Sequence, residues 1–158
     1  MTREPKRVAD SITEQIQILM PQHINGAGRL FGGQLVEWID IVAGVVARRH
    51  SERNVITAAI DNLQFKEGAY PNDTLVLIGR ITHVGRTSME VRVDTYVEAL
   101  NGMRRVVNRA YLVLVALDES GKPAEVPGLT LENEVERAEW EAGQRRRDLR
   151  RQRRAEGY

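Results

Sequence analysis

An aspartate stands in an otherwise largely apolar segment of the sequence. Asp40 lies between Ile39 and Ile41, in a stretch with few other polar residues. A carboxylate in such a segment costs free energy unless it is paired, hydrated or kept for function. Positioned carboxylates act as general bases or as nucleophiles. From spacing alone, solvent exposure or an ion pair with Arg48 or Arg49 accounts for Asp40 as well as a catalytic role does.

Two glycines, Gly32-Gly33, stand at the predicted start of the helix that carries Asp40. Glycine lets a ligand approach the unpaired N–H groups of a helix start, where the helix dipole favours negative charge. An oxyanion hole needs these properties. The alternative is a tight loop that requires a positive φ. Asn25, in the preceding loop, is either a turn former or a donor to a substrate carbonyl.

Together these residues indicate acyl transfer to water, or the binding of an acyl group without hydrolysis. The absence of cysteine excludes disulfides, thiolate metal sites and a cysteine nucleophile. No serine lies in a G-x-S-x-G motif, and no Walker-type or dinucleotide-binding glycine motif occurs. His23, His50 and His83 lack the spacing of metal ligands, so we expect no metal site.

The segment that carries Asp40 is predicted to be a buried helix. Over residues 34–50, apolar side chains recur with helical spacing, and Trp38, Ile41 and Val45 make the opposite side apolar too. We therefore expect a central helix around which other elements wrap. Before it, a strand is predicted over residues 11–19, ended by a proline.

After this helix the sequence is rich in β-forming residues. Strands are predicted over residues 54–65, 74–84, 87–100 and 104–117. The strongest hairpin signal is Asn101-Gly102. In the third strand apolar residues alternate with Glu90, Arg92 and Asp94, which predicts one face in contact with water.

A second helix is predicted over residues 132–154, with glutamates early and arginines late, as the helix dipole favours. The order of one strand, a buried helix, four strands and a final helix predicts an α+β fold built on an antiparallel sheet. The length of 158 residues fits one domain. No apolar run approaches the roughly 20 residues that span a bilayer, and the first residues lack the apolar core of a signal peptide. We expect a cytoplasmic protein with no membrane partner.

In sequence order, the chain carries motifs similar to those of the hotdog-fold acyl-CoA thioesterases, the acyl-CoA hydrolase family. The most specific stretch is His23-Ile24-Asn25 followed by residues 28–40, which end in Asp40. Further similar segments are Val55-Ile56-Thr57-Ala58 with Phe65, residues 84–91, Val115-Ala116-Leu117-Asp118, Gly121-Lys122-Pro123 and Val126-Pro127. The resemblance predicts a thioesterase domain over residues 1–129. Residues 130–158 are then a charged C-terminal helix and arginine-rich tail, not a separate domain.

This resemblance implies the hotdog fold, in which an antiparallel sheet wraps a long central helix, here with an added C-terminal helix. It also implies homodimers whose sheets join edge to edge, often as a trimer of dimers, that is, a homohexamer. Joined edges remove the hazard of exposed edge strands. The implied reaction, a step of lipid metabolism, converts acyl-CoA and water to a free carboxylic acid and coenzyme A. No separate cofactor is implied, because coenzyme A is part of the substrate and a product.

Four positions match catalytic positions of the family. Asp40 matches its carboxylate, which acts as general base or as a nucleophile through a mixed anhydride. Gly33 matches the helix-start residue whose N–H polarises the thioester carbonyl. Asn25 matches an asparagine expected to act with Asp40 of the partner subunit. Thr57 matches a threonine that orients water or the base.

The turn Gly85-Arg86-Thr87-Ser88 resembles the family's coenzyme A contact, where Arg86 would meet phosphate oxygens. A plain β-turn with a solvated arginine is the alternative. The chain departs from the family in having Gly26-Ala27 after Asn25, where a proline is frequent, which predicts a more flexible loop.

Two other functions remain open at this point. One is a hotdog module that binds or senses acyl-CoA without turnover, although such a module would need neither Asp40 nor Asn25. The other is a hydratase or dehydratase, which usually pairs a histidine with an aspartate and would rely on His23.

The charge of the chain is concentrated at its end. Residues 145–158 hold seven arginines against Asp148 and Glu156, whereas the net charge of the whole chain is only +1. Aromatic interleaving and recognition motifs are missing, so we expect no nucleic-acid partner. A solvated helix end or a disordered terminus is expected. Some of these arginines would otherwise lie near the phosphates of coenzyme A on a neighbouring subunit.

Overall fold

The computed structural model describes residues 3–158. Its central element is helix α1 (Gly32–Ser51). The other helices are α2 (Glu134–Glu156) and the short 3-10 helices η1 (Val8–Asp10) and η2 (Pro21–His23). The strands are β1 (Lys6–Arg7), β2 (Thr13–Ile18), β3 (Asn54–Phe65), β4 (Thr74–Val84), β5 (Ser88–Glu98), β6 (Arg104–Leu117) and β7 (Leu129–Thr130).

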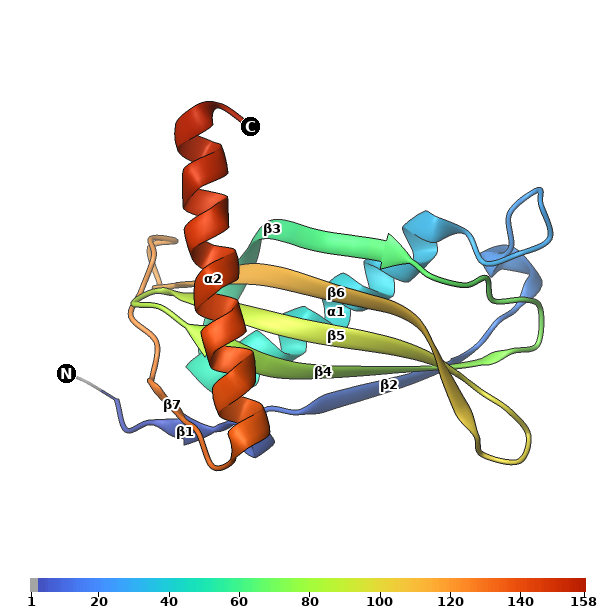
Figure 1. Ribbon diagram of the computed structural model, residues 1–158, viewed down its shortest axis with the longest axis horizontal. Coiled ribbons are helices and arrows are strands. Elements are labelled where there is room, and N and C mark those ends of the chain that lie inside the picture. Colours follow the sequence, from blue (N-terminus) through green and yellow to red (C-terminus); the bar gives the residue numbers. More distant parts are fainter. Residues whose placement is uncertain (1–2) are drawn as a thin grey trace.

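Five strands form one antiparallel sheet in the order β2-β4-β5-β6-β3. Helix α1 lies along one face of this sheet and α2 crosses the other face (Figure 1). The predicted hotdog arrangement, with its long central helix and an added C-terminal helix, is therefore confirmed. Sequence patterns did not predict the small parallel pair of β1 and β7.

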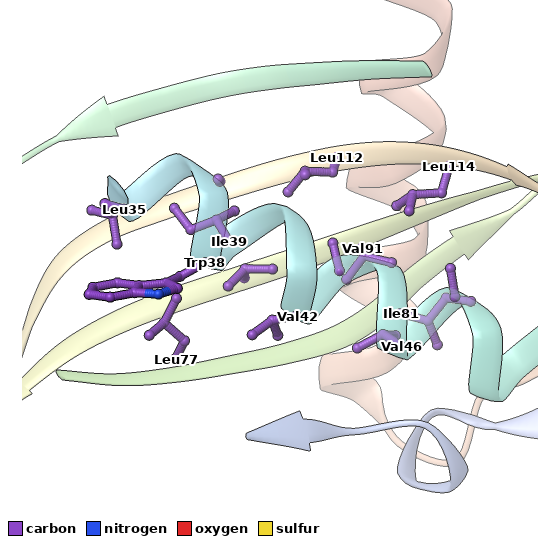
Figure 2. Packing of buried hydrophobic residues seen from close by; sticks show 14 of the residues in the cluster. Leu35, Trp38, Ile39, Val42, Val46, Leu77, Ile81, Val91, Leu112 and Leu114 are labelled. Atoms are coloured by element: carbon purple, nitrogen blue, oxygen red, sulfur yellow. The ribbon is translucent and has the colours of Figure 1, made fainter. Parts of the chain in front are cut away.

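Apolar residues of α1 form the core with the inner face of the sheet. Figure 2 shows Leu35, Trp38, Ile39, Val42 and Val46 directed at Leu77, Ile81, Val91, Leu112 and Leu114, and all of these side chains are buried. Gly79 permits the closest approach, because a Cβ there would lie 2.7 Å from Val42 Cγ1 and 2.9 Å from Val46 Cγ2. Close packing of this kind holds α1 in a fixed position on the sheet.

The prediction that one face of β5 is wet was wrong. Glu90 is 2% exposed and Asp94 is fully buried. Arg146 and Arg150 of α2 pair with Glu90, while Arg92 and Arg109 pair with Asp94. The alternating pattern is real, but the polar side chains face a layer of arginines instead of solvent.

The C-terminal arginines belong to a continuous helix, since α2 extends to Glu156. Asn133 caps its start by accepting a hydrogen bond from the Glu136 N–H. Arg150 and Arg153 pair with Asp61 of β3. The end is therefore a helix and not a disordered terminus; residues 151–158 are exposed, as expected of a solvated helix end, whereas Arg150 is largely buried against the sheet.

Strand β3 is an outer strand of the sheet and is largely exposed. Ile56, Ile60 and Phe65 are 51%, 40% and 55% exposed. Ile41 of the neighbouring α1 is 49% exposed. An open edge beside exposed apolar side chains is a surface suited to another protein chain. Across residues 3–158, neither long helix has the length and apolar character needed to cross a membrane.

Candidate active site

The start of α1 presents backbone N–H groups at a surface lined by aromatic rings. Gly32 and Gly33 have helical backbone rather than a positive φ, so the loop alternative does not apply. A Cβ on Gly33 would lie 2.7 Å from the ring of Phe31, and one on Gly32 would lie 3.4 Å from the ring of Phe65. Within the described residues, the Gly33 N–H has no hydrogen-bond partner. It is therefore available to a carbonyl oxygen.

Asp40 and Thr57 meet across the gap between α1 and β3. The Thr57 hydroxyl donates a hydrogen bond of 2.6 Å to Asp40 Oδ1. The register between β3 and β6 shifts between Thr57 and Ala59, and a bulge of this kind redirects side chains beside it. Within residues 3–158 no group bonds to Asp40 Oδ2, so the carboxylate has a fixed orientation and one oxygen available for a water molecule.

The alternative ion pair between Asp40 and a nearby arginine is not found in residues 3–158. Arg49 instead donates from Nη1 to the Ile12 carbonyl at 2.9 Å and to Thr13 Oγ1 at 3.1 Å. Asp40 is only half-buried. Among the described residues, Asp40 is therefore held by a hydroxyl and not by a guanidinium.

Asn25 shapes the loop before α1. Its side-chain Oδ1 accepts hydrogen bonds from the N–H groups of Ala27 at 2.9 Å and Arg29 at 3.3 Å. This is turn formation, one of the two roles expected for it. No bond joins Asn25 to Asp40 within the described part of the chain. Its Nδ2 group has no partner there, so this amide can still donate to another molecule.

A hollow of about 310 Å³ opens beside the helix start. Leu30, Leu35, Phe65 and Val107 provide its apolar walls. Sequence reasoning identified Phe65 only as part of a matching segment and did not place it here. No local pattern signals this role, because residues from the loop, α1, β3 and β6 meet only in the fold.

The turn Gly85-Arg86-Thr87-Ser88 joins β4 to β5 away from α1's first turn. It is tight, because the Gly85 N–H donates to the Ser88 carbonyl at 2.8 Å. Arg86 is 77% exposed and lies 3.8 Å from Glu125. This position fits both roles expected for Arg86, a contact to coenzyme A and a solvated side chain on a plain β-turn.

The histidines have structural surroundings. His23 Nδ1 accepts from the Met20 N–H at 3.0 Å, and its ring packs edge-on against Trp38. His50 is buried and bonded to the Pro127 carbonyl at 2.8 Å. Neither is bonded to Asp40. No cluster of potential metal ligands occurs within residues 3–158.

Comparison with known proteins identifies a family. Residues 27–101 match the family model "Thioesterase superfamily". The chain is 35% identical over 136 residues to the Bacillus subtilis protein named "Uncharacterized acyl-CoA thioester hydrolase YkhA", covering 85% of this chain and 79% of that protein.

Solved structures agree over nearly the whole chain. An apo-hexameric acyl-CoA thioesterase is 38% identical with a TM-score of 0.92, covering 97% of this chain and 99% of that one. A Staphylococcus aureus acyl-CoA hydrolase in complex with butyryl coenzyme A and coenzyme A is 32% identical with a TM-score of 0.90, covering 96% and 93%. That hydrolase has also been solved with one aspartate, one asparagine or one threonine replaced by alanine.

The fold and the carboxylate beside the helix start thus define a protein of the thioesterase superfamily. Within it, the chain belongs to the acyl-CoA thioester hydrolase family.

Proposed function

We propose that this chain hydrolyses acyl-CoA to a free carboxylic acid and coenzyme A, with Asp40 as general base. The observation that carries this proposal is the hydrogen bond from Thr57 to Asp40, beside a helix start with an open N–H. In the Staphylococcus aureus enzyme, the asparagine, aspartate and threonine replaced by alanine have the same separations along the chain as Asn25, Asp40 and Thr57.

Asp40 Oδ2 takes a proton from water, and the water oxygen attacks the thioester carbonyl carbon. Thr57 holds Oδ1, so the carboxylate does not rotate as the proton is transferred. The negative charge on the carbonyl oxygen is stabilised by the Gly33 N–H and the dipole of α1. The carbon–sulfur bond then breaks, and the coenzyme A thiolate leaves and takes up the proton from Asp40.

An isotope experiment separates this route from a mixed anhydride. In a single turnover in H₂¹⁸O, a general base sends the label only into the released acid. A nucleophilic Asp40 becomes part of an anhydride, and attack of water on the aspartyl carbonyl of that anhydride leaves ¹⁸O in the aspartate side chain. Mass spectrometry of the peptide that contains Asp40 detects this label, and a labelled Asp40 contradicts the general-base route.

The apolar hollow beside the helix start is suited to the acyl chain. Leu30, Leu35 and Phe65 line it together with Gly32, so an acyl group seated there keeps its carbonyl near the helix N-terminus. An apolar wall stabilises an alkyl chain through removal of its surface from water.

The active assembly is a homo-oligomer built from dimers joined at β3. The open edge of β3 and the exposed side chains of Ile41, Ile56 and Ile60 support this assembly. Three similar thioesterases are described as hexameric, which supports a trimer of dimers. In such a dimer the free amide of Asn25 donates toward the site around Asp40 of the partner subunit.

The test is release of free thiol from a panel of acyl-CoAs of increasing chain length, read with a thiol reagent. Hydrolysis predicts one thiol and one carboxylic acid for each substrate consumed. Tight binding of acyl-CoA in calorimetry without thiol release would instead identify a binding module.

A further inference from the structure

Arg147 of α2 lies against the turn that joins β4 to β5. Its Nη1 and Nη2 atoms are each 3.1 Å from the position that a Cβ on Gly85 would occupy. This places a guanidinium from the C-terminal helix beside a turn more than fifty residues earlier in the sequence. Figure 1 shows α2 crossing the sheet at the end where β4 and β5 are joined.

Unlike Arg146 and Arg150 on the same helix, Arg147 has no acidic partner within residues 3–158. Arg146 and Arg150 both pair with the buried Glu90. The pKa of Arg147 is lowered by partial burial and by repulsion from Arg151 and Arg150, with only a smaller opposing effect from Asp148. Arg147 is therefore a half-buried cation in a locally positive field. Such a group gains most from an anion.

The turn itself offers further donors. The Arg86 carbonyl accepts from the Val126 N–H and the Thr87 carbonyl accepts from the Ala116 N–H, each at 3.0 Å, so both carbonyls are occupied. The N–H groups of Arg86 and Thr87 have no partner in the part of the chain that the structure describes. Successive free N–H groups at a turn attract anions.

Position 85 requires glycine because neighbouring side chains leave no room for a Cβ, and not because of its backbone conformation. Its φ is not positive, unlike that of Gly102 and Gly121. A side chain there would lie 2.8 Å from Ser88 Oγ and would displace Arg147. Gly85 thus keeps the Arg147 guanidinium at the turn.

We propose that Arg147 of α2 is a further contact for the phosphate groups of coenzyme A, added to the turn that the family resemblance already assigns to coenzyme A. The inference rests on the proposed function and adds a residue from α2 to the substrate site. The location is consistent with that role. Met89, directly after the turn, pairs with Leu114 of β6, and Leu114 pairs with Thr57 of β3. Two strand spacings, roughly 10 Å, therefore separate this end of β5 from the strand that holds Thr57.

The experiment compares Arg147→Gln with Arg145→Gln in the full chain. Arg145 is exposed, and no hydrogen bond or ion pair to it occurs in the described residues, so both variants lose one charge from the same turn of α2. Calorimetry measures the Kd of coenzyme A, dephospho-coenzyme A and pantetheine, and steady-state assays measure kcat and KM for an acyl-CoA. Inorganic phosphate is included as a competitor.

For Arg147→Gln we expect the Kd of coenzyme A and the KM of acyl-CoA to rise about tenfold, as loss of a charge-assisted hydrogen bond predicts. The kcat and the Kd of pantetheine, which has no phosphate, stay at wild-type values. Arg147→Lys restores part of the affinity because it keeps the charge without the planar fork. Arg145→Gln behaves as wild type.

Equal coenzyme A affinity in Arg147→Gln and wild type overturns the inference, as does an equal loss of affinity for pantetheine. If millimolar phosphate competes as strongly as coenzyme A, the site is a general anion site and the assignment to coenzyme A is wrong. If Arg147 governs coenzyme A affinity but wild type releases no thiol, the subsite stands and the proposed hydrolysis fails.

Discussion

Glu90 of β5 and Arg146 of α2 form a buried ion pair, with 2.7 Å between Glu90 Oε1 and Arg146 Nη2. Thr82 donates a further hydrogen bond of 2.7 Å to Glu90 Oε1. The Arg146 guanidinium also stacks 3.7 Å from the centre of the Tyr111 ring. The pair attaches the C-terminal helix to the outer face of the sheet and explains why a charged strand residue is buried there.

Arg146→Met should destabilise the fold by about 3 kcal/mol, because it leaves a buried carboxylate with fewer partners. Arg150 Nη1 remains 3.4 Å from Glu90 Oε2, which limits the loss of stability. Urea unfolding followed by circular dichroism measures the change. The control is Arg137→Met, which removes an exposed pair with Glu134 on the same helix and should cost less than about 1 kcal/mol. Equal losses in the two variants would contradict a buried anchor at Arg146.

Gly79→Ala should also destabilise the protein, by about 1–3 kcal/mol, because the added methyl overlaps Val42 and Val46 of α1. Gly26→Ala is the matched control, since a Cβ there would meet nothing within 4 Å and the backbone φ is not positive. Thermal unfolding of the two variants checks the prediction. A Gly79→Ala protein as stable as wild type would mean that α1 does not lie so close to β4.

Stability should fall as the pH drops below about 6.5, because His50 and His83 are buried. Burial lowers the pKa of both imidazoles in the folded state, so the unfolded chain binds protons first and acid favours unfolding. Each histidine contributes at most about 1.4 kcal/mol per pH unit. Urea midpoints at pH 7.5, 6.5 and 5.5 measure the slope.

The variants His50→Gln and His83→Gln should each reduce that slope, whatever they do to the stability at pH 7.5. An unchanged slope in both would assign the acid sensitivity to other groups. Glu90 is one such group, but because its pKa is lowered in the folded state, its contribution to stability is lost only as the pH falls below about 4.5.

Thr57→Ala should lower kcat about tenfold or more, because the Asp40 carboxylate loses the hydrogen bond that orients it. KM should change little, since Thr57 holds the base and not the substrate. Thr130→Ala, an exposed threonine on β7, is the control. If Thr57→Ala retained full kcat, the hydroxyl would have no part in positioning Asp40.

The helices and strands of this fold can largely be predicted from its sequence, whereas the packing of α2 on the outer face of the sheet cannot. Strands β3, β4 and β6 coincide with the predicted ranges, because β-branched runs and turn signals such as Asn101-Gly102 are local features. The buried outer face of β5 was missed, since the partners of Glu90 lie on α2, far along the chain. The alternation of apolar and polar residues along a strand predicts which side chains share a face of the sheet, but it does not predict whether solvent or another element lies against that face.

The candidate site likewise contains residues that can be recognised in the sequence and contacts that can be seen only in the fold. Asp40 and the glycines of the helix start stand out because their types conflict with a buried helix. The contact between Asp40 and Thr57 depends on the bulge in β3, and the place of Arg147 depends on how α2 crosses the sheet. Neither contact has a local signal in the sequence.

The most direct test of the account is thiol release from acyl-CoA by wild type and Asp40→Asn, with both proteins shown to be folded by circular dichroism. General-base catalysis contributes roughly 10²–10⁴-fold to a rate. We therefore expect kcat to fall by about a thousandfold in Asp40→Asn, with little change in the affinity for coenzyme A. A folded Asp40→Asn protein with wild-type kcat would contradict the assignment of Asp40 as the catalytic base.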